Sequence, residues 1–105
     1  MPIDLAALRR AVSANQYAFS EHALQRGSER AIHKPEIEEA LLNAEVIEDY
    51  PEDKRGASCL LLGRSSSGRA LHIQVGYAYP VFRIITFYEP EPEKWETDLK
   101  TRKAK

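Results

Sequence analysis

The sequence predicts an α+β fold in which three helices come first along the chain and pack on one face of an antiparallel sheet of about four strands. The main observation is a change of period, because apolar residues recur at helical spacing up to Asn43 and at strand-like spacing after it. A second observation is composition: 43% of the 105 residues are hydrophobic and 30% are charged. These proportions are typical of a globular chain, and we expect one domain over residues 1–105.

Each of the three helices is predicted from a local signal. Residues 2–14 place apolar side chains at near-helical spacing, which predicts a first helix. Ser20 is a good N-cap residue and predicts the start of a second helix, in which Gly27 marks a weak point where a bend or break is expected. Residues 33–44 predict a third helix, because Pro35 suits a first turn and an apolar face follows it.

Four later segments have the pattern of strands. They cover residues 45–50, 57–63, 70–77 and 80–90. The second is almost entirely apolar, which predicts a central place in the sheet, and the third alternates between apolar and polar side chains. The polar residues 64–69 predict a hairpin loop, and residues 94–105 predict a short helix or a frayed end.

The charge is distributed unevenly along the chain. The formal net charge of −1 argues by itself against nucleic-acid binding. Residues 35–53 carry eight acidic side chains and no lysine or arginine, whereas residues 54–88 carry five basic side chains and no acid. The near-neutral total therefore hides a basic central stretch, although ordinary segregation of surface charge explains the pattern equally well.

Two features indicate the compartment. The single cysteine, Cys59, cannot form an internal disulfide and lies in an apolar run, which predicts a buried structural thiol. No apolar run approaches the roughly 20 residues that a membrane-spanning helix needs, and the first ten residues lack a signal-peptide pattern. We therefore expect a cytoplasmic protein that does not associate with membranes.

Seven polar side chains form the candidate site. On a helix, residues four apart share a face, so His22, Arg26 and Arg30 would form one polar stripe. His72 projects from the polar face of the third predicted strand. The set is completed by Arg83, Thr86 and Tyr88 of the last strand. Alternation along that strand places Arg83 on the face opposite Thr86 and Tyr88 unless a β-bulge intervenes.

These residue types suit the metal-free cleavage of an RNA phosphodiester. A base must remove the 2′-hydroxyl proton, an acid must protonate the leaving 5′-oxygen, and cations must offset the charge that develops on phosphorus. Histidine titrates near neutral pH and can serve in either proton role. Arginine binds phosphate oxygens through paired hydrogen bonds, and tyrosine donates to an oxyanion or stacks on a base.

No metal or cofactor site is predicted. A zinc site needs three or four ligands at typical spacing, and two separated histidines with a cysteine inside an apolar strand do not supply them. The stretch GRSSSGR over residues 63–69 lacks the ending of a P-loop and lies between two strands rather than before a helix.

Three stretches carry a resemblance to a known family. The first is Ser-x-His-Ala-x-x-Arg-x-x-x-Arg-x-Ile over residues 20–32, the second is ALHIQV over residues 70–75, and the third is IITFYEPEPEKW over residues 84–95. Together they resemble a family of bacterial domains of unknown function (DUF4258-type), which is grouped with the RelE-like and BrnT-like toxin ribonucleases. The resemblance covers about residues 17–95, the core of the single domain.

This resemblance implies a RelE-like fold, in which helices pack on a curved antiparallel sheet and RNA binds the open face. It also implies a metal-independent endoribonuclease of a toxin–antitoxin pair. The partners would be RNA, including ribosome-bound mRNA, and a small antitoxin protein. His72 and His22 would transfer protons, and Tyr88 would orient or stack on the substrate. Arg26, Arg30 and Thr86 would bind RNA, with Arg83 as a secondary candidate.

Two alternatives stay open at this point. The protein could be a non-catalytic binding module or a degenerate toxin that only pairs with a partner protein, an interpretation that the near-neutral net charge favours. The stripe could also be structural, with His22 packed under the sheet edge and with Arg26 and Arg30 paired to the acids of residues 36–49. The catalytic interpretation requires His22 and His72 to meet within reach of one substrate.

Overall fold

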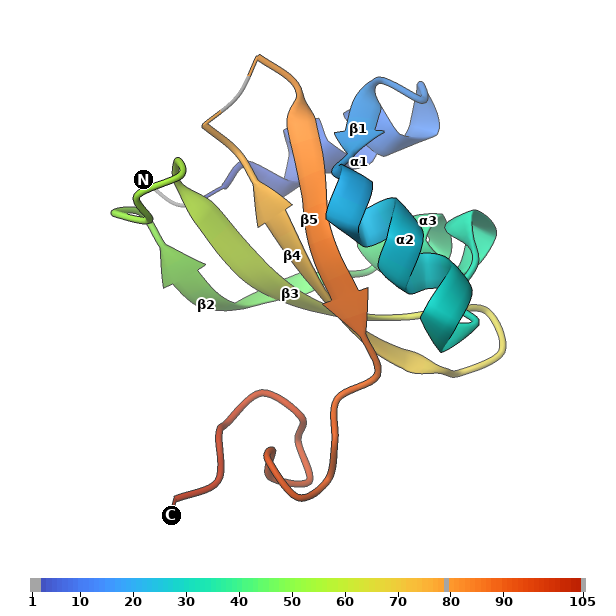
Figure 1. Ribbon diagram of the computed structural model, residues 1–105, viewed down its shortest axis with the longest axis vertical. Coiled ribbons are helices and arrows are strands. Elements are labelled where there is room, and N and C mark those ends of the chain that lie inside the picture. Colours follow the sequence, from blue (N-terminus) through green and yellow to red (C-terminus); the bar gives the residue numbers. More distant parts are fainter. Residues whose placement is uncertain (1–2, 79, 105) are drawn as a thin grey trace.

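The computed structural model describes residues 3–78 and 80–104, and its three helices come before the main strands (Figure 1). The helices are α1 (Leu5–Ser13), α2 (Glu21–Arg30) and α3 (Lys34–Leu42). Helix α2 continues without a break through Gly27, because the missing side chain at this position lets the helix approach the ring of Phe87. Among the described residues, no helix is long and apolar enough to cross a membrane.

The sheet has five strands rather than four, and it is mixed rather than purely antiparallel. The strands are β1 (Tyr17–Phe19), β2 (Glu45–Tyr50), β3 (Ser58–Arg64), β4 (Ala70–Gly76) and β5 (Phe82–Tyr88), in the order β1-β5-β4-β3-β2. The four expected strands pair antiparallel. The unexpected strand β1 pairs parallel with β5, and Phe19 lies opposite Ile84.

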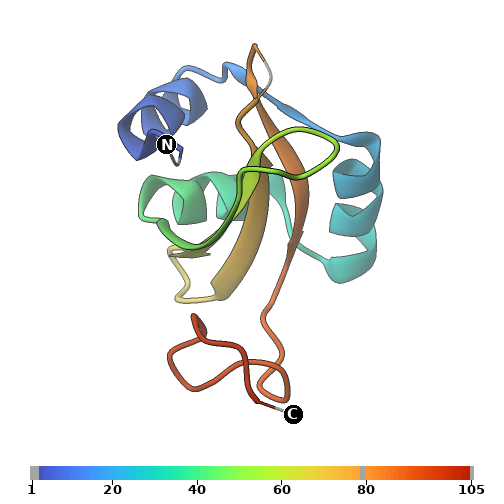
Figure 2. The same ribbon diagram turned by 90° about the vertical axis from the view of Figure 1, so that its left-hand side faces the viewer.

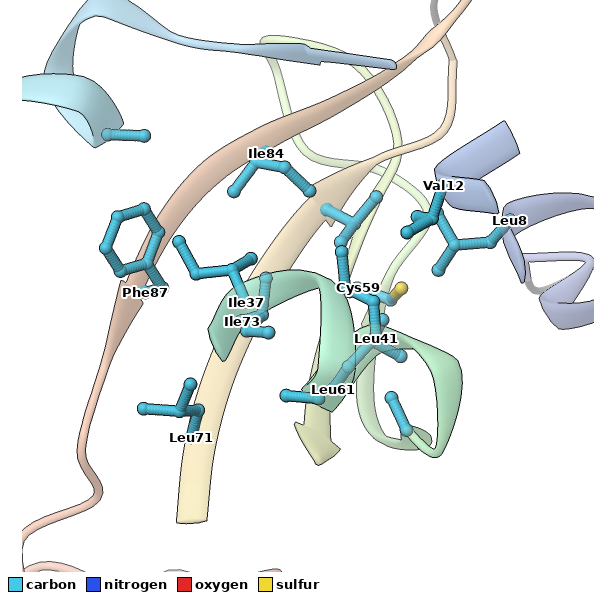
Figure 3. Close-up of a cluster of buried hydrophobic side chains, with 14 of the residues drawn as sticks. Leu8, Val12, Ile37, Leu41, Cys59, Leu61, Leu71, Ile73, Ile84 and Phe87 are labelled. Carbon is cyan, nitrogen blue, oxygen red and sulfur yellow. The ribbon is translucent and has the colours of Figure 1, made fainter. Parts of the chain in front are cut away.

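The core lies between the helices and one face of the sheet (Figure 3). Alternate residues of the central strands point to it, including Leu61 of β3 and Ile73 of β4, and they meet Leu8, Ile37 and other apolar side chains of the helices. All of these side chains are buried. Burial of this much apolar surface is the main contribution to the stability of the fold.

Gly63 sets how closely α3 approaches the sheet. A Cβ atom added at this position would lie 2.1 Å from the carbonyl oxygen of Ala40 in α3. Only glycine therefore permits this helix-to-strand distance, because the neighbouring atom belongs to the backbone and cannot rotate away. The contact fixes α3 over the centre of the sheet.

Residues 91–104, which we call the C-terminal segment, do not form the short helix that the sequence suggested. They form turns and one isolated β-bridge between Trp95 and Arg102. The segment lies beyond the end of β5 and away from the three helices in both views (Figures 1 and 2). It packs on the face of the sheet opposite the helices, where Trp95 is buried.

Candidate functional site

The sheet face opposite the helices, which we call the outer face, carries four of the seven predicted site residues. The register places Tyr88 opposite His72, Thr86 opposite Gln74 and Arg83 opposite Gly76. Because the β4 residues in these pairs alternate along their strand, all of their partners share one face. A β-bulge between the last two pairs makes this possible, and it brings Arg83 to the side of Thr86 and Tyr88.

His72 is completely buried on the outer face. Its Nε2 atom lies 2.7 Å from the carbonyl oxygen of Leu99, so Nε2 carries the proton and donates it. The other ring nitrogen, Nδ1, is buried without a hydrogen-bond partner among the described residues. Burial lowers the pKa of His72, and the hydrogen bond to Leu99 opposes that shift only in part. The ring is therefore neutral at pH 7.

Two aromatic rings pack against His72. The ring of Tyr88 lies 5.4 Å away and the indole of Trp95 lies 4.4 Å away, both in edge-to-face geometry. Burial raises the pKa of Tyr88, so its hydroxyl stays protonated and can donate a hydrogen bond. The three rings form one aromatic cluster at the end of β5.

An open pocket of about 550 Å³ lies next to this cluster and is lined by Tyr88, Trp95 and Arg30. The guanidinium of Arg30 donates a hydrogen bond of 2.6 Å to the carbonyl oxygen of Phe87, which fixes the side chain at the pocket wall. Arg30 forms no ion pair with any residue that the structure describes. Its positive charge therefore stays uncompensated at the pocket, where an anion could bind it.

The other charged groups of the pocket are already paired. Lys94 lies 3.7 Å from Glu91, and the Arg102 guanidinium donates two hydrogen bonds to Glu48 while it lies 4.7 Å from the centre of the Trp95 ring. Glu89 accepts a bond of 2.6 Å from Arg69. Sequence reasoning did not include these residues, because most of them come from the C-terminal segment and the hairpin loop, which have no periodic pattern, while Glu48 of β2 and Glu89 after β5 are paired only through contacts with those regions.

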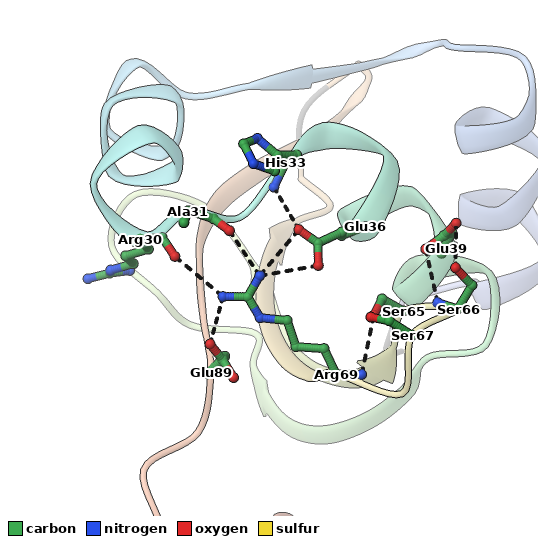
Figure 4. A network of polar contacts seen from close by, with 10 residues as sticks. All are labelled: Arg30, Ala31, His33, Glu36, Glu39, Ser65, Ser66, Ser67, Arg69 and Glu89. Atoms are coloured by element: carbon green, nitrogen blue, oxygen red, sulfur yellow. Dashed lines mark hydrogen bonds and ion pairs between the residues drawn. The ribbon is translucent and has the colours of Figure 1, made fainter.

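Arg69 holds three elements together at the edge of this pocket (Figure 4). Its guanidinium donates to the carboxylates of Glu36 in α3 and Glu89 after β5. It also donates to the carbonyl oxygens of Arg30 and Ala31 at the end of α2. A cation at this helix C-terminus satisfies carbonyl groups that lack partners within the helix. The network fixes the backbone that presents Arg30 to the pocket.

His22 lies elsewhere. It is exposed near the start of α2 and lines a second pocket of about 360 Å³ with Arg83 and Arg55. Helix α2 runs alongside β5, with the Ser20 hydroxyl bonded to the Ile85 carbonyl oxygen at one end and Arg30 bonded to Phe87 at the other. A rise of about 1.5 Å per residue separates His22 from Arg30 by roughly 12 Å along the helix.

The structure thus brings Arg30 and Tyr88 to one pocket, with His72 buried against the ring of Tyr88, and places His22 with Arg83 at the other end of α2. Arg26 lines neither pocket and pairs with Glu29 at 3.0 Å. Neither Arg26 nor Arg30 pairs with a described acid of residues 36–49. The ion pairs expected if the stripe were only structural are therefore not formed. Among the described residues, no group of three histidine, cysteine, aspartate or glutamate side chains could hold a metal ion.

A comparison with known protein families matches the segment that carries Arg30, His72 and Tyr88. A family model described as "Domain of unknown function (DUF4258)" matches residues 19–89. The chain belongs to this family. In this DUF4258 domain, the matched region runs from Phe19 to Glu89, so the C-terminal segment lies outside it. No curated protein and no solved structure matches the chain.

Proposed function

We propose that this DUF4258 domain binds single-stranded RNA at the pocket beside Arg30 and cleaves it without a metal ion, as a toxin-type endoribonuclease of RelE-like fold. The observation that carries the proposal is Arg30, a cation that forms no ion pair with any described residue and is held next to the ring of Tyr88. Guanidinium groups bind phosphate through paired hydrogen bonds, and aromatic rings stack on unpaired bases. This combination is typical of single-strand binding sites.

Cleavage would use the residues that line the outer face. Arg30 would hold the scissile phosphate, and the Tyr88 hydroxyl would donate to one of its oxygens. A base takes the proton of the 2′-hydroxyl, the 2′-oxygen attacks phosphorus, and the 5′-oxygen leaves with a proton. The products are a 2′,3′-cyclic phosphate and a 5′-hydroxyl. His72 can accept a proton at Nδ1, which has no partner among the described residues, but it can donate the proton on Nε2 only after the hydrogen bond to Leu99 breaks.

The first experiment measures binding of a short single-stranded RNA by fluorescence anisotropy in EDTA. Arg30→Gln should weaken binding about tenfold or more, because a hydrogen bond to a charged group contributes roughly 1.5–3 kcal/mol. Arg30→Lys keeps the charge but not the paired hydrogen bonds, so its affinity for RNA should lie between those of the wild type and Arg30→Gln. Arg10→Gln removes an exposed cation from α1 and serves as the charge-matched control. Equal losses in the Arg30 and Arg10 variants would contradict the proposed site.

The second experiment tests cleavage, with and without ribosomes, also in EDTA. A product that ends in 2′,3′-cyclic phosphate and is lost in His72→Ala would support catalysis. His22→Ala decides whether the second pocket takes part, since His22 and His72 lie at different places in the domain. Cutting that is equal in the wild type and both histidine variants would contradict the assignment.

A second candidate function is a non-catalytic module that binds a partner protein, such as a small antitoxin. The observation that favours it is an apolar groove between α2 and α3, lined by Phe19, Gly27 and Phe87, at which Leu24 is 62% exposed. Co-expression with the product of a neighbouring small open reading frame tests this candidate. Leu24→Glu should abolish co-purification and leave RNA binding unchanged, whereas co-purification that survives this change would contradict it.

A further inference from the structure

The outer face beneath the C-terminal segment has the composition of a surface that binds flat rings. The rings of His72 and Tyr88 lie side by side on neighbouring strands. Leu60 and Leu62 of β3 lie on the same face and are buried, although they are not part of the core under the helices. Sheet faces that present aromatic rings in this way bind unstacked nucleobases.

Trp95 occupies this surface in the structure. Its indole packs at 88° to the ring of His72, with 4.4 Å between the ring centres. The guanidinium of Arg102 lies 4.7 Å from the centre of the indole on the side of the C-terminal segment. A purine base is also a planar bicyclic ring, and it can make the same edge-to-face contact with an aromatic side chain and the same contact with an arginine.

Apart from the buried ring of Trp95, the C-terminal segment is held by a few polar contacts, and its charged side chains in them are exposed. Lys100 pairs with Glu45 at 2.8 Å and Arg102 pairs with Glu48, but the side chains of Lys100 and Arg102 are 46% and 59% exposed. Exposed ion pairs contribute little to stability. Arg102 also interacts with Tyr50 of β2. A further polar anchor is the bond from His72 to Leu99, whose backbone has a φ of 61° in the left-handed region.

His72 gives a second, independent indication. Its Nδ1 atom is a buried hydrogen-bond acceptor for which the described residues provide no donor. Native proteins rarely leave such a group without a partner, because desolvation without a hydrogen bond costs free energy. A base amino group or a ribose hydroxyl supplies the missing donor, which the indole of Trp95 packed against the ring does not provide.

We infer that the outer face around His72 and Tyr88 is a binding surface for an unstacked nucleobase, and that the Trp95 side chain covers this surface when no RNA is bound. RNA must therefore displace the C-terminal segment to reach this surface and His72. The inference rests on the proposed function, since it assigns the ligand class to the same site. Beyond that function, we infer that the C-terminal segment, which lies outside the family match, competes with RNA for the outer face.

One pair of variants at Leu99 tests this competition without a change of charge. Leu99→Pro cannot adopt the left-handed backbone and cannot donate the bond from its amide to the Glu96 carbonyl oxygen, so it displaces the Leu99 carbonyl from His72. Leu99→Gly adopts the same backbone readily and serves as the matched control. We expect Leu99→Pro to bind single-stranded RNA several-fold more tightly than Leu99→Gly. Equal or weaker binding by a folded Leu99→Pro would overturn the inference.

A second pair of variants covers the case in which Leu99→Pro does not fold. Lys100→Gln and Lys103→Gln each remove one positive charge from the C-terminal segment, but only Lys100 pairs with Glu45. If the segment competes with RNA, Lys100→Gln should bind at least as tightly as the wild type, while Lys103→Gln binds more weakly. Equal losses in both variants would show that the segment only contributes charge, and would overturn the inference.

Trp95 is the single tryptophan of the chain, so its fluorescence reports displacement directly. RNA should shift its emission to longer wavelength as the indole moves from a buried to a solvated position. Arg30-dependent binding without this shift would overturn the inference and leave the proposed function intact. Absence of RNA binding in the wild type and in all four variants would instead contradict the proposed function itself, and the inference with it.

Discussion

The Nε2 atom of His72, in the middle of the outer face, lies 2.7 Å from the carbonyl oxygen of Leu99 in the C-terminal segment. This hydrogen bond joins a central strand of the family-matched region to residues that lie outside the match. Burial keeps the imidazole neutral and away from solvent, whereas the hydrogen bond itself favours the charged ring. The state of His72 therefore depends on whether the C-terminal segment is in place.

Acidification should destabilise the fold through His72. Its pKa is lowered in the folded state, so the unfolded chain binds a proton first as pH falls. The contribution of His72 to the free energy of unfolding is fully present above about pH 6.5, the pKa of histidine in the unfolded chain. This contribution is lost as the pH falls from there towards the lower pKa of the folded state. Urea unfolding at pH 8, 7, 6 and 5 measures this loss.

The control for this pH dependence is His72→Gln, which should flatten the curve between pH 7 and pH 5. His22→Gln removes an exposed histidine and should leave the curve unchanged. The carboxylate of Glu48 is a separate contribution, because its bonds from Arg102 lower its pKa below the usual carboxyl range. Its protonation therefore lowers stability only at more acidic pH. A steep loss that persists in His72→Gln would refute the assignment.

Gly63→Ala should destabilise the fold by at least about 1–3 kcal/mol, the usual cost of overpacking. The added Cβ would lie 2.1 Å from the carbonyl oxygen of Ala40, and relief requires α3 to move away from the sheet. Gly27→Ala is the comparison, since its Cβ would lie 3.1 Å from a ring carbon of Phe87 and alanine favours the helix. Chemical denaturation should show a much larger loss for Gly63→Ala than for Gly27→Ala.

Ala31→Gly should stabilise the domain by roughly 0.5–1 kcal/mol. Ala31 ends α2 with a φ of 53°, a left-handed conformation that glycine adopts without the steric cost of a Cβ atom. Ala14 ends α1 with a φ of −91°, so Ala14→Gly relieves no strain and should give no gain. Thermal melts of the two variants compare these positions directly, and a rise for both would point to a cause other than backbone strain.

Arg69→Gln should weaken the contacts that hold the end of α2 against α3 and the end of β5. The guanidinium is mostly buried and bonds both Glu36 and Glu89, and hydrogen bonds to charged groups contribute roughly 1.5–3 kcal/mol. Arg64→Gln, an exposed arginine at the other end of the same hairpin, is the control. Hydrogen exchange should become faster at the end of α2 in the first variant only. Unchanged exchange there would mean that the network does not fix the helix end.

Most of the elements could be predicted from the sequence, because their patterns are local. Helices α1 and α3 and strands β2 to β5 each carry a run of apolar residues, and the start of α2 is marked by its N-cap residue Ser20. Strand β1 was missed because three residues are too few to show a period, and its parallel partner lies at the other end of the chain. The end of the sequence, including Leu99, has no period either, and its order comes from contacts with the sheet.

The candidate site could be predicted only in part. The sequence identified Arg30, His72 and Tyr88 as candidate site residues. The alternation of β5 also indicated that Arg83 lies on the same face as Tyr88 only if the strand contains a β-bulge, and the structure contains one. The distance from His22 to His72 could not be predicted, because it depends on the direction in which α2 runs beside β5. The packing of Trp95 on His72 could not be predicted either, because it depends on the path by which the C-terminal segment folds back onto the sheet.

The pairing of β1 with β5 has a consequence for the order of folding. During synthesis the hairpin of β3 and β4 emerges early enough to form from neighbouring residues. Strand β1 is made much sooner but must wait for the last strand, because Phe19 pairs with Ile84. Such long-range contacts slow folding, since a large loop must close before they form. Closure of the sheet around β5 is therefore expected to be a late step, reached only when nearly the whole chain has left the ribosome.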